Sequence, residues 1–147
     1  MAMVQKSLLI ERSSQQMFDL VDDVESYPKF LPWCNQTRVE FRDDTKTIAT
    51  LHIKYHSVKS LFTTENEKEY PSRMTIKLVD GPFRQLEGTW HFRALAENAC
   101  KIEFQLSYEF SSKLFEKIIG SIFSQIANTF VEAFVKRADA VYGVPNV

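Results

Sequence analysis

The chain has 147 residues, the usual size of one domain, and we interpret residues 1–147 as a single domain. Its 18 Lys and Arg residues nearly balance its 19 Asp and Glu residues, for a formal net charge of −1. This balance provides no strong positive field, so composition argues against a DNA-binding protein. The 12 Phe, 5 Tyr and 2 Trp residues must pack against one another or surround a hydrophobic guest, and composition does not decide which.

Cysteine usage and the amino-terminal sequence indicate a cytoplasmic bacterial protein. Cys34 and Cys100 lack CxxC spacing, so reduced thiols are expected. Residues 1–14 contain neither the apolar core of a signal peptide nor the Arg- and Ser-rich run of a transit peptide. Because no stretch of about 18 consecutive apolar residues occurs, any contact with the inner membrane is expected to be peripheral or through a carried ligand.

The first elements expected are a strand over Val4–Glu11 and a helix that begins after Ser13. Ser13 and Gln16 have the spacing of a capping box, in which each side chain bonds the backbone amide of the other residue. Apolar residues then recur at helical spacing over residues 17–24.

Two prolines interrupt this helical pattern. The residue before a proline avoids the helical region, so a second short helical turn is expected between Pro28 and Pro32. Tyr27, Phe30 and Trp33 form an aromatic cluster on this segment. The cluster has two equally good interpretations, a hydrophobic plug at one end of a sheet and part of the mouth of a pocket.

Between Gln36 and Phe110 apolar residues recur at every second position, which predicts six half-buried antiparallel strands. Turn sequences at Asp43-Asp44, Tyr70-Pro71-Ser72 and Asp80-Gly81-Pro82 join them as a meander. The last strand has the clearest alternation, with Ile102, Phe104, Leu106, Tyr108 and Phe110 on one face.

The segment Asp80-Gly81-Pro82-Phe83 is a rigid turn that runs directly into a strand. The inward side chains of this strand are expected to be Leu86, Gly88, Trp90 and Phe92. Gly88 lets the sheet curl or another group approach closely, which suits a strand that lines a cavity. The alternative is a tight hairpin in which Gly88 accommodates a bulky neighbour.

A long helix is expected to begin after Ser111-Ser112 and to run to about Tyr142, before Gly143 and Pro145. About 30 residues at ~1.5 Å each give a rod of ~45 Å, which should lie across the whole sheet. Lys136-Arg137 would complement the negative end of its dipole. Its broad apolar face comprises Phe115, Ile118, Ile119, Ile122, Phe123, Ile126, Phe130 and Phe134.

The segment from Asp22 to Cys34, together with Asp80-Gly81-Pro82-Phe83, resembles the coenzyme Q-binding and ribosome-association-toxin (RatA-type) family of START-like proteins. This family is grouped with polyketide cyclase/dehydrase-like domains, and the resemblance covers nearly the whole chain. It implies an α+β, helix-grip (START/Bet v 1-like) fold. In that fold a curved antiparallel sheet of about seven strands grips a long C-terminal helix, and two short helices follow the first strand.

The space between the helix and the sheet has two interpretations. Periodicity favours a close-packed core, whereas the resemblance favours a tunnel. The expected lining residues are Phe41, Leu51, Ile53, Phe62, Ile76, Leu86, Trp90, Phe104, Leu106, Ile118, Ile122 and Ile126, with Ile122 opposite Trp90 or Phe104.

The resemblance implies a non-catalytic binding protein that holds a hydrophobic small molecule, most simply ubiquinone or a related polyprenyl quinone, and requires no cofactor. The tail would lie under the helix and the head near Trp33 and Phe83. Such a protein would act as a carrier or chaperone in respiratory electron transport.

The resemblance also implies an alternative, because some bacterial members are described as blocking ribosomal subunit association. Such a protein would bind a ribosomal subunit and prevent subunit joining, and the sequence does not choose between the two functions. The first phosphate contacts to consider are Lys29, Arg38, Lys54, Lys59, Arg73 and Arg84.

The sequence gives little support for catalysis or for a metal site. His52 and His56 should lie ~13 Å apart on the polar face of one strand, too far for easy binding of one metal ion. His91 is expected at the rim or in solvent. The acids of Asp22-Asp23-Val24-Glu25 have no histidine or nucleophile at a telling spacing, and no phosphate-binding glycine loop occurs.

Overall fold

The structure is a computed structural model that describes residues 1–144. It has the predicted α+β helix-grip architecture, with seven strands, two short helices after the first strand and a long C-terminal helix. The elements are β1 (Ala2–Ile10), α1 (Ser14–Asp22), the 3-10 helix η1 (Val24–Lys29), β2 (Cys34–Arg42), β3 (Lys46–Tyr55), β4 (Val58–Glu69), β5 (Arg73–Asp80), β6 (Phe83–Ala96), β7 (Ala99–Phe110) and α2 (Lys113–Tyr142).

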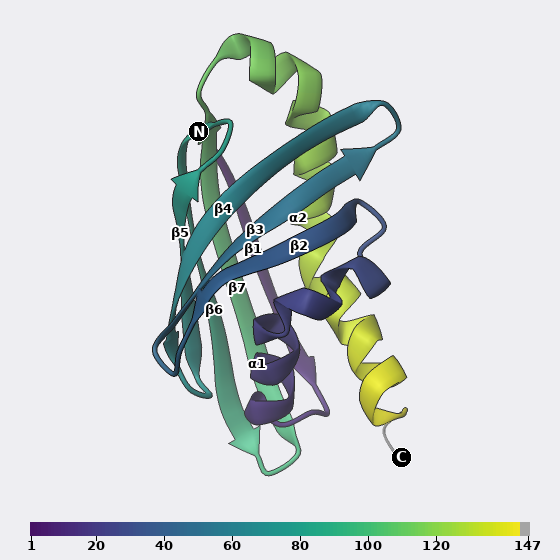
Figure 1. Cartoon of the computed structure of the whole chain (residues 1–147). Helices are drawn as coiled ribbons and strands as arrows, with labels where there is room; N and C mark the ends of the chain where they lie inside the picture. Colours follow the sequence, from purple (N-terminus) through teal and green to yellow (C-terminus); the bar gives the residue numbers. More distant parts are fainter. Residues whose placement is uncertain (145–147) are drawn as a thin grey trace.

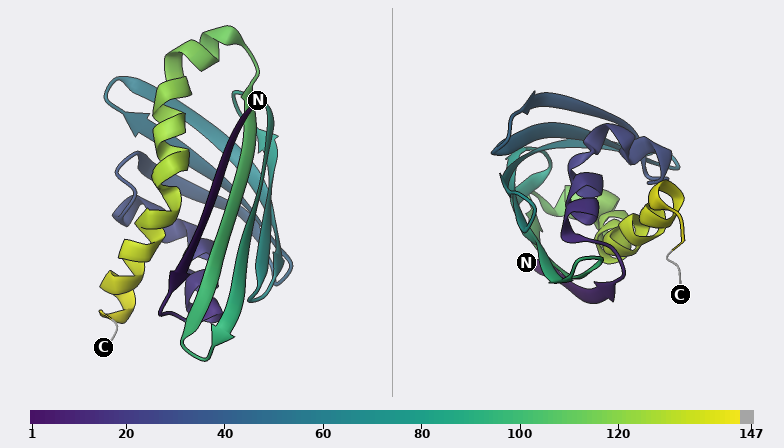
Figure 2. Two further views of the ribbon diagram at one scale, coloured as in Figure 1. Left: turned by 180° about the vertical axis from the view of Figure 1, so that it is seen from behind. Right: turned by 90° about the horizontal axis from the view of Figure 1, so that it is seen from below.

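The strands form one antiparallel sheet in the order β1-β7-β6-β5-β4-β3-β2 (Figure 1). Strands β2 to β7 are a meander, and β1 pairs with β7. The segment that contains α1 and η1 therefore connects the two edges of the sheet. The sheet curves around α1 and α2, as the end-on view in Figure 2 shows.

Both α-helices begin as the sequence predicts, and α2 also ends where predicted. The Ser13 hydroxyl accepts from the backbone amide of Gln16 at 3.1 Å, and the Gln16 side chain accepts from the Ser13 amide at 2.9 Å, which completes the capping box. The Ser112 hydroxyl accepts from the Phe115 amide at 3.1 Å at the start of α2. Gly143, with φ of 81°, ends α2, and Pro145 lies outside the described residues.

The connections differ from prediction in two places. Element η1 begins before Pro28 and contains it, whereas a helical turn was expected after this proline. Burial of Val24 and Tyr27 fixes this earlier 3-10 segment. The prediction that His56 lies on a strand with His52 is wrong, because β3 ends at Tyr55 and His56 has a positive φ of 55° in the β3–β4 turn.

The core lies between the concave face of the sheet and one stripe of α2. The buried residues of this stripe are Ile119, Phe123, Ile126, Ala127, Val131, Phe134 and Ala138. Trp90 packs between strand and helix, with ring centroids 4.6 Å from Phe104 and 5.5 Å from Phe134. By length and composition α2 would suffice to cross a bilayer, but here its buried stripe packs on the sheet.

The glycines in the β5–β6 region make room for protein atoms. A Cβ at Gly88 would lie 2.9 Å from the Gln105 carbonyl oxygen and 3.0 Å from Leu106 Cδ1, which favours the interpretation of a bulky neighbour. At Gly81, where φ is +147°, a Cβ would lie 2.7 Å from Phe62 Cβ. The turn therefore packs directly on β4.

The cation at the carboxyl end of α2 comes from the connection between β1 and α1. Arg12, which is 5% exposed, donates to Asp139 at 2.8 Å and to the Gly143 carbonyl. The last turn of α2 contains no basic residue, so the expectation that Lys136 and Arg137 complement this helix end is wrong.

Candidate functional site

An internal cavity of about 70 Å³ lies between α2 and the sheet. Aromatic and aliphatic side chains from α1, η1, the sheet and α2 form nearly all of its wall. The lining residues are Val21, Val24, Tyr27, Trp33, Ala49, Leu51, Phe62, Thr64, Asn66, Ile76, Leu86, Trp90, Phe104, Leu106, Phe123, Ile126, Ala127 and Phe130. This space is well below the 300–1,000 Å³ typical of pockets for drug-sized ligands.

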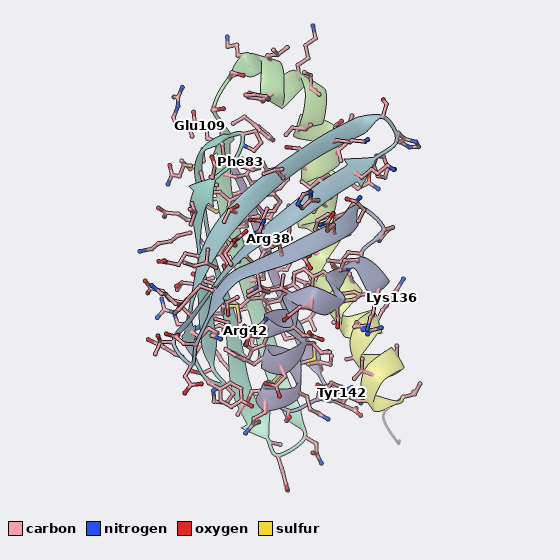
Figure 3. The ribbon with its side chains drawn as sticks, in the orientation of Figure 1. Arg38, Arg42, Phe83, Glu109, Lys136 and Tyr142 are labelled. Atoms are coloured by element: carbon pink, nitrogen blue, oxygen red, sulfur yellow. The ribbon has the colours of Figure 1, made fainter. Side chains whose placement is uncertain are left out.

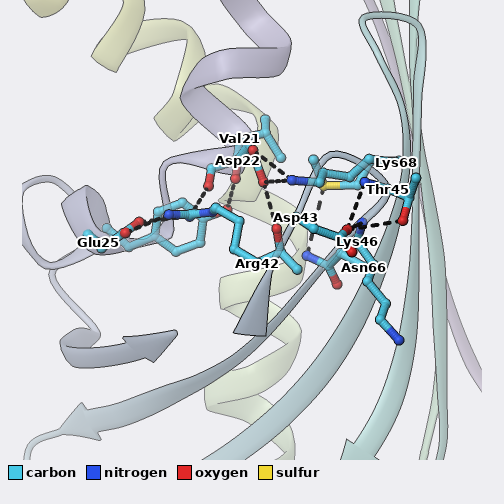
Figure 4. Close-up of polar contacts among 12 residues, drawn as sticks. Val21, Asp22, Glu25, Arg42, Asp43, Thr45, Lys46, Asn66 and Lys68 are labelled. Atoms are coloured by element: carbon cyan, nitrogen blue, oxygen red, sulfur yellow. Dashed lines mark hydrogen bonds and ion pairs between the residues drawn. The ribbon is translucent and has the colours of Figure 1, made fainter. Parts of the chain in front are cut away.

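The cavity wall has a polar spot on β4, formed by Thr64 and Asn66. The Asn66 side chain is held by one weak contact, from Nδ2 to Met74 Sδ at 3.8 Å (Figure 4). Asn66 Oδ1 is buried and has no hydrogen-bond partner among the described residues. A buried carbonyl oxygen without a donor is costly, so this atom is suited to a guest that donates a hydrogen bond.

A second concavity, hereafter the groove, has a volume of about 580 Å³ and lies between the η1–β2 connection and α2. Its lining residues are Lys29, Phe30, Leu31, Pro32, Trp33, Tyr55, Ile122, Gln125, Ile126, Thr129, Glu132, Ala133, Lys136, Arg137 and Ala140. Trp33 and Ile126 line both the groove and the cavity, so these two side chains separate the two spaces.

The groove carries an excess of positive charge. Lys29 belongs to η1, and Arg137 and Lys136 belong to α2; Lys136 is labelled in Figure 3. Arg137 lies over the Phe30 ring, with its Cζ 5.2 Å from the ring centroid. The acid in the lining, Glu132, is paired with Lys6 of β1 at 3.7 Å.

A polar network fixes η1 against the sheet (Figure 4). Arg42 of β2 donates to both carboxylate oxygens of Glu25, at 2.6 and 2.8 Å, and to the Asp22 carbonyl oxygen at 2.8 Å. Lys68 of β4 bonds the Asp22 carboxylate at 3.2 Å, as does the Thr47 hydroxyl at 3.1 Å. Hydrogen bonding from Arg42 lowers the pKa of Glu25. The acids of this motif therefore have a structural role, in holding the segment that leads to the groove.

The structure brings most of the predicted lining residues to the internal cavity. Those that line it are Trp33, Leu51, Phe62, Ile76, Leu86, Trp90, Phe104, Leu106 and Ile126. Ile53 and Phe83 are buried but lie outside the cavity wall. Phe83 packs instead on Phe62, Phe110 and Phe123, so it contacts two residues of the cavity wall, Phe62 and Phe123, without lining the cavity itself.

Three further predicted lining residues do not line the cavity. Phe41 is 43% exposed, because a register shift between Val39 and Phe41 turns its side chain to the other face of β2. Ile118 is 49% exposed, because the first turns of α2 extend beyond the sheet (Figure 2). Ile122 lines the groove, and Phe130 takes the expected place beside Trp90 and Phe104, at 5.7 and 5.8 Å between ring centroids.

Several cavity residues were not predicted. Val21 and Val24 come from α1 and η1 and were not among the expected lining residues, whereas Tyr27 and Trp33 belong to the aromatic cluster for which a plug or a pocket mouth was expected. Thr64 and Asn66 alternate with Glu65 in β4 and thus point inward. The sequence pattern did not indicate them, because it identifies inward positions by apolar residues. Phe130 and Phe123 belong to the predicted apolar face of α2, and their spacing could have identified them.

Titratable side chains suitable for catalysis do not converge at this site. Within residues 1–144 no group of three or more His, Cys, Asp or Glu side chains could hold a metal ion. Cys34 and Cys100 are free and buried, and burial raises the pKa of each thiol to about 11. Both are therefore protonated near neutral pH and are poor nucleophiles.

The predicted phosphate contacts differ in their surroundings. Arg38 is paired with Glu40 at 3.3 Å, and Arg84 is paired with Glu109 at 3.6 Å. Figure 3 labels Arg38 and Glu109. Lys54 and Lys59, which are both exposed, are directly opposite each other in the β3–β4 hairpin. Lys54 lies between inward-facing residues of β3, so this lysine pair lies on the side of the sheet away from α2.

A curved antiparallel sheet around a long helix, with an apolar cavity between them, defines a START-like, helix-grip protein. The chain belongs to the family described as polyketide cyclase / dehydrase and lipid transport, whose model matches residues 10–135.

Relatives of known name extend along almost the whole chain. "Ribosome association toxin RatA" of Vibrio cholerae is 41% identical over 143 residues, which cover 97% of this chain and 99% of the relative. The protein of the same name in Escherichia coli K12 is 38% identical over 97% of this chain and 90% of its own length. "Coenzyme Q-binding protein COQ10 homolog B, mitochondrial" of Xenopus laevis is 30% identical, and the match covers 58% of that protein.

Solved structures share the fold at low sequence identity. A protein from Thermus thermophilus superposes with a TM-score of 0.76 at 20% identity, with 95% of each chain covered. A Streptomyces aromatase/cyclase has the same TM-score at 10% identity, over 94% of this chain and 93% of that one. At such identities the comparison establishes the fold alone.

Proposed function

We propose that this protein binds a ribosomal subunit in the cytoplasm and hinders association of the two subunits, without catalysing a reaction. The main support is the similarity to the RatA proteins of Vibrio cholerae and Escherichia coli, at 41% and 38% identity over nearly the full length of both chains. Quinone binding was the leading expectation from the sequence and ribosome binding its alternative, and the similarity to the RatA proteins favours the alternative.

The β3–β4 hairpin is the surface that we propose for the contact with ribosomal RNA. No acidic residue occurs between His52 and Leu61, whereas Lys54 and Lys59 lie opposite each other. Like charges directly opposite destabilise a strand pair, so this arrangement is costly unless an anion lies over it. RNA phosphates provide such an anion.

The test is sedimentation of purified ribosomal subunits with and without the protein in sucrose gradients. The wild-type protein should reduce the peak of joined ribosomes and co-sediment with one subunit. The Lys54→Gln/Lys59→Gln variant should bind more weakly, and the slope of log affinity against log salt should become shallower by about 2, one per lost phosphate contact.

The matched control is Lys77→Gln/Lys101→Gln, which removes the same charge from β5 and β7, away from the hairpin. This control should behave as wild type. Unchanged subunit and ribosome peaks with excess wild-type protein would refute the ribosomal function, and equal losses in both double variants would refute the hairpin surface.

A second candidate function is binding of a hydrophobic small molecule, such as ubiquinone, between α2 and the sheet, which requires the internal cavity to open beyond its volume of about 70 Å³. It is supported by the apolar wall and by the similarity to the Xenopus COQ10 homolog. Lipid extraction from natively purified protein, followed by mass spectrometry, tests it. Repeated absence of any quinone or lipid, together with no binding of added ubiquinone, would exclude this function.

A further inference from the structure

We propose that the groove between η1–β2 and α2 is a binding site for an anionic amphiphile, a molecule with one carboxylate or phosphate head and an unbranched apolar tail. The head would lie among Lys29, Lys136 and Arg137, and the tail would follow Ile122 toward Trp33 and Ile126. This inference goes beyond both candidate functions, since neither involves this groove or a charged ligand.

The first argument is available space. The groove, at about 580 Å³, lies within the range of small-molecule sites, whereas the internal cavity, at about 70 Å³, is too small for an amphiphile. A ligand can therefore bind in the groove without any movement of the core. The cavity offers room only for the end of a tail.

The second argument is charge that the fold does not use. Lys136 and Arg137 do not lie in the last turn of α2, where Arg12 already bonds the helix end. Within residues 1–144, none of Lys29, Lys136 and Arg137 forms an ion pair. The Arg137 guanidinium lies over the face of the Phe30 ring. Three cations around an apolar groove match a single anionic head on an apolar tail.

The third argument is the shared wall. Trp33 and Ile126 are each 7% exposed and line both spaces. The backbone at Trp33 is fixed, since its carbonyl oxygen accepts from the Lys54 amide at 2.8 Å. A path between the groove and the cavity would therefore require movement of the Trp33 or Ile126 side chain and not of the backbone at Trp33.

The test is a titration of the full chain with cis-parinaric acid, a fluorescent fatty acid, and with its uncharged methyl ester. Dodecyl phosphate and inorganic phosphate, as competitors, distinguish a headgroup on a tail from a free anion. Wild type should bind the acid at least about tenfold more tightly than the ester, dodecyl phosphate should compete, and inorganic phosphate alone should compete only weakly.

Two variants localise the site. Lys29→Gln/Lys136→Gln should weaken binding of the acid about fivefold to tenfold and should leave binding of the ester unchanged. Ile122→Trp, which fills the groove, should weaken binding of both. Lys77→Gln/Lys101→Gln is the charge-matched control and should bind the acid as wild type does.

Several results would overturn the proposal. These are no binding by wild type, equal affinity for acid and ester, or an equal loss in the control. If Lys29→Gln/Lys136→Gln loses ribosome binding but retains the fatty acid, the groove is an RNA contact and the proposal is wrong. Failure here is distinguishable from failure of the ribosomal function, which is read from the Lys54→Gln/Lys59→Gln variant in sucrose gradients.

Discussion

Trp33 and Ile126 form a shared wall, with one side of each residue in the internal cavity and the other in the groove. They come from opposite parts of the chain, Trp33 from the η1–β2 connection and Ile126 from the middle of α2. These two side chains therefore lie between the groove and the cavity.

Truncation of this wall should connect the two spaces. Ile126→Ala should cost about 2–5 kcal/mol of unfolding free energy, because it leaves a hole in a packed core. In the folded fraction, association of cis-parinaric acid measured by stopped flow should become faster. Ala138→Gly, a truncation on the same stripe away from the groove, is the control; an unchanged association rate in Ile126→Ala would contradict a role for Ile126 as a barrier.

Ala127 is the position for filling the cavity from α2, because it is 2% exposed and lines the cavity wall. If the cavity holds a guest, Ala127→Leu should reduce ubiquinone binding with little change in melting temperature. If the space is a close-packed core, the added volume should instead cost about 1–3 kcal/mol. Melting curves and a quinone titration on one preparation separate the two results.

The unpartnered oxygen of Asn66 should affect both stability and ligand binding. Asn66→Leu removes a buried polar group that has no donor, so the free energy of unfolding should rise by about 1 kcal/mol. Binding of a ligand with a hydroxyl group, such as ubiquinol, should weaken more than binding of its oxidised form. Chemical denaturation and paired titrations measure these effects, and a loss of stability would show that a water or protein donor satisfies this oxygen.

The ion pair between Glu25 and Arg42 should make stability depend on pH. Hydrogen bonding from Arg42 lowers the pKa of Glu25 below its ordinary value of 4.5. The pair therefore stabilises the fold above that value, and the stabilisation is lost as pH falls through the lowered pKa. Between about pH 5 and about pH 3, the melting temperature should therefore fall more for wild type than for Glu25→Gln. The control is Glu97→Gln, a change at an exposed residue of the β6–β7 turn, which should behave as wild type.

The lysine pair of the hairpin predicts opposite effects on stability and on binding. Lys59→Glu replaces a like-charge pair with an opposite-charge pair across from Lys54, which should raise the unfolding free energy by about 0.2–1 kcal/mol. The same change should abolish ribosome binding, because it places a negative charge against RNA phosphates. A destabilised variant, or one that binds ribosomes normally, would contradict the proposed role of this surface.

Much of the fold could be predicted from local chemistry. The alternation in β7 and the capping residues Ser13 and Ser112 each depend on neighbours within a few positions, so they are readable without a tertiary structure. The β3–β4 turn at His56 could not be predicted, because it contains no glycine or proline. The predicted inward position of Phe41 was wrong because the register shift between β2 and β3 cannot be detected in the alternation of apolar and polar residues along β2.

The sequence alone determined the order of the elements and the apolar stripe of α2, because periodicity and turn residues act over short distances. Its motifs at residues 22–34 and 80–83 carried the resemblance to the family. The tertiary structure decided the size of the cavity, the free oxygen of Asn66 and the groove that gathers Lys29, Lys136 and Arg137. These features arise where segments distant in sequence meet. Their volumes depend on how side chains from η1, the sheet and α2 interlock, which no local pattern specifies.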